Sequence, residues 1–338
     1  MIQDDPNSIL STWTPRKCPC QFSGVTCLAG RVSETNLSGS GLSGTVSFNA
    51  FTSLNALSVL KLSENILLTE DLFLGTKKLQ TLDLSYNNIT GSISGLTIPL
   101  SSCGSWSSID LSGNGISGFV PVPLTNCTKL KSLNLSHNNF DGQIPKSLGE
   151  LKTLQSLDLS HNRLTGWIPL EIGEACGSLQ NLWISYNGTG VIPDSLSACS
   201  WIQTLDLSNN NISSPFPDKI LRSFGSLQIL LLSENSYPVC FRQRSLIELS
   251  IPDNLVTGEI TMTISQCFEL GTIDLSRNYL NGSMPPEIGN LQKLERFIAW
   301  YNNLAGTIPP EKIIEEKMSR KEEISYLFIV EHHRLSQP

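Results

Sequence analysis

Residues Ser156–Pro169 read SLDLSHNRLTGWIP, and this stretch holds the pattern that decides the fold. Leucines stand at alternate positions, an Asn follows three residues after the second Leu, and the stretch closes on Gly-x-Ile-Pro. Similar stretches recur as SLNLSHNNFDGQIP at 132–145, TLDLSNNNISSPFP at 204–217 and TIDLSRNYLNGSMP at 272–285. The chain therefore repeats one structural unit, and its repeated letters need a different explanation from its varying ones.

The repeated Asn, here called the ladder Asn, measures the period. Aligning each unit as L-x-x-L-x-L-x-x-N places it at Asn65, Asn87, Asn114, Asn138, Asn162, Asn187, Asn210, Asn235, Asn254, Asn278 and Asn302, with Gly41 in a first, degenerate unit. Successive spacings run from 19 to 27 residues and are most often 24. A period of this length with this spelling is the signature of leucine-rich repeats. We predict an α/β fold, a curved right-handed leucine-rich-repeat solenoid of about 12 repeats.

Each repeated letter has a structural reason. The x-L-x-L core predicts a short strand whose leucines point inward and stack on those of the next repeat. The ladder Asn stands where the chain turns off the strand, and its amide can pair with backbone groups that the bend would otherwise bury unpaired. The Gly and Ile-Pro suit a second tight bend. The repeated letters therefore build the solenoid and are not the functional site.

Composition excludes several classes of partner. The formal net charge is −7 and the pI is near 5.2, which argues against nucleic acid or an anionic membrane as the main partner. The apolar runs, such as Tyr326–Val330, are far shorter than the roughly 20 residues that span a bilayer. The N-terminal MIQDDPNSIL has no basic start before an apolar stretch, so we expect no signal peptide in it.

Five of the nine cysteines lie 11 residues before a ladder Asn, in a position that other repeats fill with Leu or Phe; they are Cys103, Cys127, Cys176, Cys199 and Cys267. We interpret them as buried free thiols that act as small apolar side chains. The segment CPCQFSGVTC precedes the first repeat, where the open end of the solenoid has to be covered. A disulfide between Cys20 and Cys27 is the favoured pairing there, although Cys18 could pair instead.

The varying residue between the last two leucines, here called the face column, is expected to point outward from the concave sheet. It reads Asp83, Asp110, Asn134, Asp158, Trp183, Asp206, Leu231, Ser250, Asp274 and Ile298. The simplest interpretation of Asp at this position is a solvated residue that is common in this type of repeat. The outliers Trp183, Leu231 and Ile298, together with nearby Trp300, are apolar where their neighbours are polar, and we predict that they contact a protein or peptide.

The N-x-S/T pattern marks candidate glycosylation sites at Asn36, Asn88, Asn126, Asn134, Asn211 and Asn281. Asn187 also fits the pattern but doubles as a ladder Asn, which makes it a poor acceptor. The repeat consensus itself produces the tripeptides NLS and NIS, so a match to the pattern is weak evidence for glycosylation. We favour Asn36 and Asn281 as the glycosylated sites.

No catalytic constellation emerges, and we predict a protein that is not an enzyme, without cofactor or metal. The stretch GSGLSGTV at 39–46 matches a kinase glycine-rich loop by letter, but its Leu, Gly and Val fall in register with the repeat. His137 and His161 stand 24 residues apart in equivalent positions and are expected to be neighbours on one face. No nucleophile is paired with them, so we add them to the binding candidates.

Longer stretches resemble a known family. Trp13 followed by CQFSGVTC resembles the N-terminal cap of plant leucine-rich-repeat receptor kinases, and LTGWIPLEIG and LNGSMPPEIG are similar to the plant-specific repeat class. The runs VSFNAFTSL, LTIPLSSC, LRSFGSLQILLLSEN, PDNLVTGEI and IGNLQKLERFIAWYNNLAG resemble the ectodomain of brassinosteroid-receptor-like kinases, in particular the vascular branch. The likeness covers roughly residues 1 to 310.

The resemblance implies a domain plan and shows departures from it. We expect an N-terminal cap at 1–30, repeats at 31–310 that are irregular near 66–80 and 236–250, and a charged tail without repeats at 311–338. A short helix is expected at Glu311–Glu323. The 19-residue step from Asn235 to Asn254 breaks the frame, and Gln243 falls in a core position. The family's steroid-binding island, transmembrane helix and kinase have no counterpart in these 338 residues, so we expect a truncated ectodomain.

The resemblance implies an extracellular recognition module at the plasma membrane or in the apoplast. Its partners would be a protein or peptide ligand and a co-receptor ectodomain, in brassinosteroid-type signalling. Without the island the chain is expected not to bind the steroid itself. Two alternatives stay open: a secreted recognition protein of the polygalacturonase-inhibitor type, and a non-functional fragment of a receptor gene.

Overall fold

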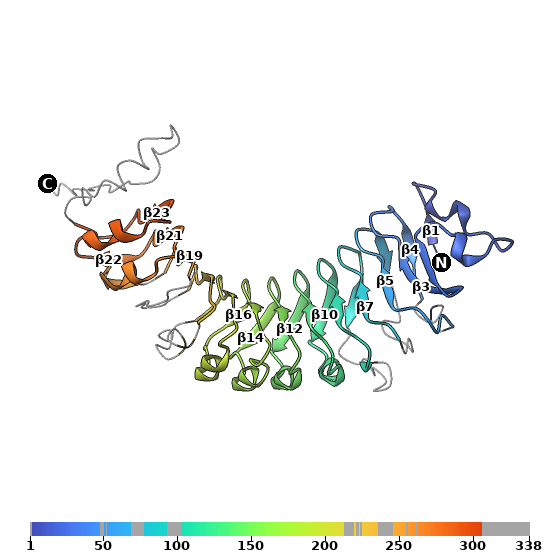
Figure 1. The fold of residues 1–338 in the computed structure, drawn as a ribbon, viewed down its shortest axis with the longest axis horizontal. Helices are drawn as coiled ribbons and strands as arrows, with labels where there is room; N and C mark the ends of the chain where they lie inside the picture. The colour runs from blue at the N-terminus through green and yellow to red at the C-terminus, as the bar shows by residue number, and fades with distance from the viewer. Residues whose placement is uncertain are drawn as a thin grey trace. The chain divides into compact units, whose positions relative to one another are not determined.

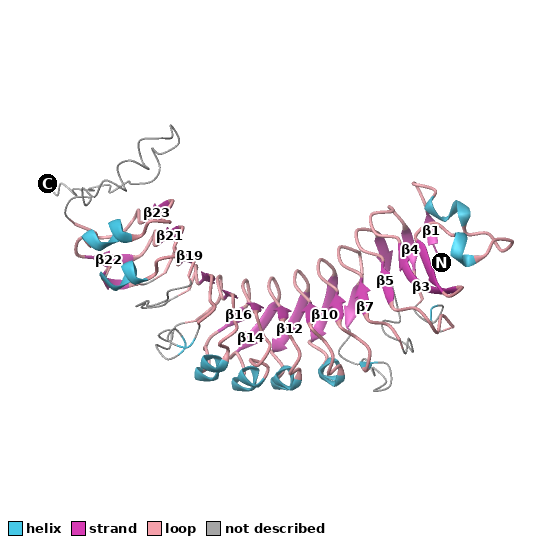
Figure 2. Ribbon diagram, in the orientation of Figure 1, coloured by secondary structure: helices cyan, strands magenta, loops and turns pink. Residues whose placement is uncertain are grey.

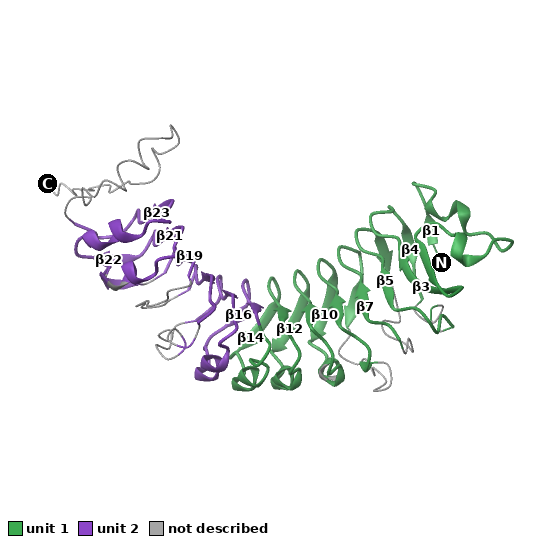
Figure 3. Cartoon of the chain, in the orientation of Figure 1, with its two compact units in different colours: residues 1–179 green, residues 180–338 purple. Residues whose placement is uncertain are grey.

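The computed structural model describes residues 2–47, 51, 53–68, 78–92, 103–212, 220, 223, 225–235, 246–254, 256–260 and 262–305. The chain divides into two compact units, residues 1–179 (unit 1) and 180–338 (unit 2), which are coloured separately in Figure 3 and are described one at a time below. The expected helix at 311–323, the rest of the tail and Gln243 lie outside the described residues.

Unit 1 is built around one sheet to which each repeat adds a strand (Figure 1). Its strands are β2 (Val25–Leu28), β3 (Arg31–Asn36), β5 (Val59–Lys61), β7 (Thr81–Asp83), β9 (Ser108–Asp110), β11 (Ser132–Asn134) and β13 (Ser156–Asp158). From β3 onward neighbouring strands are parallel, and the leucines of one strand face those of the next, as Leu133 faces Leu157. Both side chains are fully buried, so the predicted stacking of the repeated leucines forms the core.

A second parallel sheet and short helices complete the coils of unit 1. The sheet contains β8 (Thr90–Ser92), β10 (Gly115–Phe119), β12 (Asn139–Gln143) and β14 (Arg163–Gly166), and the 3-10 helices are η4 (Val122–Asn126), η5 (Lys146–Glu150) and η6 (Leu170–Glu174). Figure 2 shows these helices in cyan. The repeat Gly is required here: Gly142 has φ +74°, and a Cβ on it would lie 2.5 Å from the ring of Phe119.

The ladder Asn holds each coil to the one before it. The buried Asn138 amide donates to the carbonyls of Leu111, Leu135 and Ser136 at 2.9–3.2 Å, and its Oδ1 accepts the backbone N–H of Ile116 at 3.0 Å. These four bonds join two successive coils and satisfy backbone groups where the strand ends. The preceding residue, His137, takes a left-handed conformation with φ 53° to make this turn.

The N-terminal segment pairs with the first coil. It contains β1 (Ile2–Asp4), which pairs antiparallel with β4 (Ser43–Thr45), while β4 pairs with β6 (Ile66–Leu68). Its helices are η1 (Ile9–Thr12) and η2 (Pro19–Gln21). The Trp13 ring stacks on Phe22 with centroids 5.0 Å apart, and its indole N–H donates to the Ser23 carbonyl.

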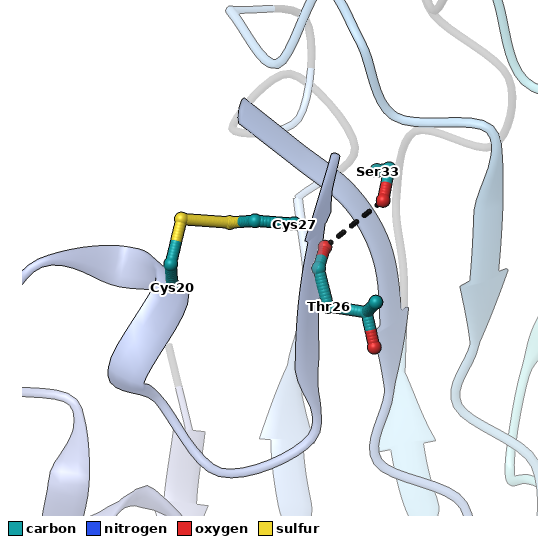
Figure 4. The surroundings of a disulfide bond; sticks show 4 residues. All are labelled: Cys20, Thr26, Cys27 and Ser33. Carbon is teal, nitrogen blue, oxygen red and sulfur yellow. Dashed lines mark hydrogen bonds between the residues drawn. A yellow bond between two sulfur atoms is a disulfide. The ribbon is translucent and has the colours of Figure 1, made fainter. Parts of the chain in front are cut away.

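A disulfide joins Cys20 of η2 to Cys27 of β2, with Cα atoms 5.5 Å apart, which is the pairing that the sequence favoured. Figure 4 shows this bridge beside the hydrogen bond from the Ser33 hydroxyl to the Thr26 carbonyl, which holds β2 to β3. Cys18 is an exposed free thiol.

The interpretation of the repeat cysteines as free thiols was wrong for most of them. Cys103 and Cys127 form a disulfide with Cα atoms 4.5 Å apart, and Cys176 and Cys199 are disulfide-bonded as well. Of the five, Cys267 is buried and keeps its thiol, as predicted. The reason is geometric: equivalent residues of successive coils are separated by about one strand spacing, which lies within reach of a disulfide.

Unit 2 repeats the same plan. Its main sheet contains β15 (Asn181–Trp183), β17 (Thr204–Asp206), β18 (Ile229–Leu231), β19 (Glu248–Ser250), β21 (Thr272–Asp274) and β23 (Arg296–Ile298). The remaining elements are β16 (Gly188–Thr189), β20 (Thr257–Glu259), β22 (Tyr279–Asn281), η7 (Asp194–Ala198), η8 (Met262–Gln266) and η9 (Pro286–Asn290). The helices named above are of the 3-10 type.

The short 19-residue step does not interrupt this sheet. Leu230 of β18 pairs with Leu249 of β19 in the same register as the other strands. The difference lies where the chain leaves the strand. The Oδ1 of Asn254 accepts the backbone N–H of Asn235 itself, whereas the Oδ1 of Asn278 accepts the backbone N–H of Val256, two positions after Asn254. The sequence predicted a break in the repeat here, but β18 and β19 are paired as the other strands are. Residues 236–245 lie outside the described part of the chain.

Candidate binding face of the repeats

The face column forms a continuous row in unit 1. The register of the parallel strands places Asp83 beside Asp110, Asp110 beside Asn134, and Asn134 beside Asp158. Lys61 extends the row on the other side of Asp83. All of these side chains are half-buried, so the row lies on the open face of the sheet, as predicted.

The Asp side chains of this row stabilise the turn that follows each strand. The Oδ1 of Asp158 accepts the backbone N–H of Ser160 at 2.9 Å and its hydroxyl at 2.7 Å. Ser85 donates the same pair of bonds to Asp83, and Ser112 donates them to Asp110. Such a side-chain cap stabilises the turn after the strand, which explains why Asp is the commonest letter of the column.

In unit 2 the column contains both capping and apolar residues. Asp206 and Asp274 cap their serines as in unit 1. The strand register places Trp183 beside Asp206, Leu231 beside both Asp206 and Ser250, and Ile298 beside Asp274. The three apolar side chains are half-buried rather than fully exposed. These side chains cannot accept the hydrogen bonds of the serine cap, so the structure of the repeat does not explain why apolar residues stand at these positions.

Trp300 belongs to a cation–aromatic cluster at the end of the described repeats. The guanidinium carbon of Arg277 lies 4.8 Å from the Trp300 ring centroid and 5.9 Å from that of Tyr301, and the two rings meet edge to face. Arg277 also pairs with Asp253 at 3.3 Å. Such contacts fix the Trp300 ring in place.

The two histidines are neighbours, as predicted. The rings of His137 and His161 stack in unit 1 with centroids 4.0 Å apart and an angle of 13° between their planes. They belong to a row formed by the residue before each ladder Asn, here called the rim row. In unit 1 it contains Glu64, Tyr86, Gly113, His137 and His161, and in unit 2 it includes Asp253, Arg277 and Tyr301. Sequence reasoning missed Tyr86, Arg277 and Tyr301, although their constant offset from the ladder Asn was a usable signal.

The structure sorts the glycosylation candidates. Five of them are exposed: Asn36, Asn88, Asn126, Asn211 and Asn281. Asn134 is engaged, because its Oδ1 accepts from Ser136 and its amide donates to Asp110. Asn187 donates to two backbone carbonyls of its own turn. Asn36 is exposed but lies in the face column, so a glycan there would stand on the sheet face.

The described residues contain no group of three or more His, Cys, Asp or Glu side chains placed to hold a metal ion. Among them there is also no helix of the length and apolarity that a membrane crossing requires.

Comparison with known proteins supports the repeat assignment. The family described as "Leucine rich repeat" matches residues 107–164, and the related "Leucine Rich Repeat" family matches 78–100, 201–222 and 269–291. The chain therefore contains leucine-rich repeats in both units.

Relatives and solved structures point to plant receptors. The chain is 61% identical over 172 residues to the serine/threonine-protein kinase BRI1-like 2 of Arabidopsis thaliana, an alignment covering 36% of this chain and 15% of that protein. Its fold is similar to a TDR receptor, with a TM-score of 0.78 and 28% identity over 83% of this chain and 49% of that one. It is also similar to the plant peptide hormone receptor RGFR1 in complex with RGF2, with a TM-score of 0.72 and 28% identity over 87% and 54%.

These likenesses show homology to BRI1-like receptor kinases and a fold shared with plant leucine-rich-repeat receptor ectodomains. The chain spans about half the length of these solved receptors and a far smaller share of the curated kinase. The kinase relative matches in the repeat region, so no enzyme domain is indicated by the match.

Proposed function

We propose that the chain is an extracellular recognition module that binds a protein or peptide ligand on the face of its repeat sheet. The observation that carries the proposal is the apolar substitution of the face column in unit 2. Trp183, Leu231 and Ile298 replace a residue that elsewhere caps a serine, and their half-exposed apolar surface has no role in the repeat itself. Aromatic and aliphatic side chains on a rigid sheet are typical anchors for a protein ligand.

The comparisons favour a peptide within this class. One similar structure is a plant peptide hormone receptor in complex with RGF2, and another is PEPR1 in complex with AtPEP1, at a TM-score of 0.67 and 28% identity. We also propose a role in brassinosteroid-type signalling outside the plasma membrane, with a co-receptor ectodomain as second partner; the homology to BRI1-like 2 supports this proposal.

Selection of peptides from a random displayed library tests this proposal. The purified chain is the target, and the matched variant carries Trp183→Asp and Leu231→Asp. Ser185 and Ser233 stand two residues further on, so each new Asp has a serine to cap. We expect the selected peptides to lose at least about tenfold in affinity on the variant. Peptides that bind both proteins equally, or no enrichment at all, would contradict the proposal.

We further propose that the described sheet face does not bind brassinosteroid. A steroid needs a pocket that encloses most of its apolar surface. The face carries carboxylates at Asp83, Asp110, Asp158, Asp206 and Asp274, and placing a steroid over them would remove these charges from water without compensation. Titration of the chain with brassinolide by calorimetry should give no saturable heat. Saturation at low micromolar concentration or below would show this prediction to be wrong.

A further inference from the structure

The last described coil of unit 2 departs from the capping pattern at two positions at once. In the coil before it, the Oδ1 of Asp274 accepts the backbone N–H of Ser276 at 3.0 Å and its hydroxyl at 2.6 Å. These bonds show that the side chains at the two positions lie side by side. The corresponding residues of the last described coil are Ile298 and Trp300. Both halves of the cap are therefore replaced there by large apolar side chains.

The second of these replacements sets this coil apart from the other apolar positions of the face column. Trp183 and Leu231 are followed two residues later by Ser185 and Ser233, so their coils keep the small residue. Ser185 is buried, whereas the much larger Trp300 side chain is half-buried. An indole does not fit where a buried serine stands, so its ring needs support from outside the core.

Arg277 supplies this support through both its backbone and its side chain. Its backbone N–H donates to the Trp300 carbonyl at 2.8 Å, and its guanidinium carbon lies 4.8 Å from the Trp300 ring centroid. One guanidinium nitrogen is 3.3 Å from a carboxylate oxygen of Asp253, which holds the cation from its other side. Tyr301 meets the same indole edge to face, with ring centroids 4.9 Å apart. Because these contacts have preferred geometries, together they favour one orientation of the Trp300 ring.

The repeat fixes the backbone of the supporting residues. Asp253, Arg277 and Tyr301 each stand one position before a ladder Asn and take the left-handed conformation, with φ of 55°, 52° and 52°. Their places on successive coils are therefore set before any ligand arrives. A side chain whose orientation is already fixed loses less conformational entropy on binding than a freely rotating one, so a fixed Trp300 makes a better anchor.

We infer that Arg277 is a positioning residue, which holds Trp300 in the orientation in which Ile298 and Trp300 together receive one apolar side chain of the ligand. The inference deepens the proposed function and rests on it, because it names the chemistry of one anchor point on the same face. Arg277 acts here through the indole ring and not through a contact of its own with the ligand. Its removal should therefore matter only while Trp300 is present.

The first test needs no ligand. The full chain is labelled with 5-fluorotryptophan, and Trp300→Phe assigns the Trp300 signal in the fluorine NMR spectrum. We expect Arg277→Ala to shift and broaden this signal alone among the tryptophan signals, and Arg277→Lys, which keeps a cation near the ring, to change it less. The control Arg163→Ala removes an exposed arginine of β14 in unit 1 and should leave the Trp300 signal in place. An unchanged Trp300 signal in Arg277→Ala would overturn the inference.

The second test uses the peptides selected from the displayed library, with thermal unfolding of each variant as the check on the fold. Affinity should fall about tenfold with Trp300→Ala and about threefold with Arg277→Ala, whereas Arg277→Ala should cost less than about twofold in the Trp300→Ala background. Arg277→Lys should recover part of the loss.

Fully additive losses would show that Arg277 does not act through the ring and would overturn the inference. If none of the selected peptides loses affinity with Trp300→Ala, the inference fails while the proposed function stands. Absence of any selected peptide would instead contradict the proposed function, and the fluorine signal of the free chain would still decide whether Arg277 fixes the ring.

Discussion

Unit 1 and unit 2 share the same repeat but differ in the face column. In unit 1 the column from Asp83 to Asp158 caps a serine in every coil, whereas in unit 2 Asp206 and Asp274 cap their serines but Trp183, Leu231 and Ile298 have no capping group. Strands β15, β18 and β23 nevertheless form in the usual register without a cap. The cap is therefore an optional stabiliser, and the column is free to vary where a surface is needed for binding.

The largest difference in stability is expected between coils that fill the core cysteine position differently. In unit 1 Cys103 and Cys127 form a bridge, whereas Cys267 of unit 2 is buried and keeps its thiol. The Cys103→Ala/Cys127→Ala variant should lose about 3 kcal/mol of unfolding free energy, because the bridge constrains the unfolded chain. Cys267→Ala, the control, should lose about 1 kcal/mol. Equal losses in denaturant unfolding would show that the bridge does not form.

The ladder Asn should matter in both units, including the short coil. Asn138→Ala and Asn254→Ala each remove a buried side chain that makes four hydrogen bonds to backbone groups. We expect each to cost about 2 kcal/mol, because the backbone partners stay buried without a replacement. If Asn254→Ala is neutral in denaturant unfolding while Asn138→Ala is not, the short step has weakened unit 2 after all.

The smallest effects come from exchanging caps between the units. Asp158→Ala should cost about 1 kcal/mol, and Asp158→Asn should cost almost nothing because Asn134 already makes the same bonds. Leu231→Asp should leave stability unchanged within about 0.5 kcal/mol, since the lost apolar contact is offset by a new cap on Ser233. A large loss with Asp158→Asn would mean that the charge itself holds the turn.

The sequence predicted the repeats, the face column and the histidine pair because each depends on a fixed spacing. A ladder Asn every 24 residues fixes which residues lie side by side, and His137 beside His161 follows from that alone. The cysteine prediction was wrong because the spacing places these residues in the core but does not give the distance between equivalent cysteines of successive coils. The Asp253–Arg277–Trp300 cluster was not predicted because its pairing depends on side-chain conformations that the repeat does not fix.

The apparent damage at the 19-residue step illustrates the same limit. The count of residues between Asn235 and Asn254 indicated a break, but it could not tell whether the strand or the outer part of the coil is shortened. The structure keeps β18 and β19 paired, because strand register depends on the inward leucines and not on the length of the returning segment.

We propose that the varying residues of the sheet face bind the ligand, while the repeated ones build the fold. Hydroxyl-radical footprinting of the chain, with and without a peptide selected against it, tests this division of roles. Trp183 lies in the face column, whereas Trp201 stands outside it and is 62% exposed. We expect bound peptide to protect Trp183 from oxidation and to leave Trp201 unchanged. Protection of Trp201 with unaltered oxidation of Trp183 would contradict it.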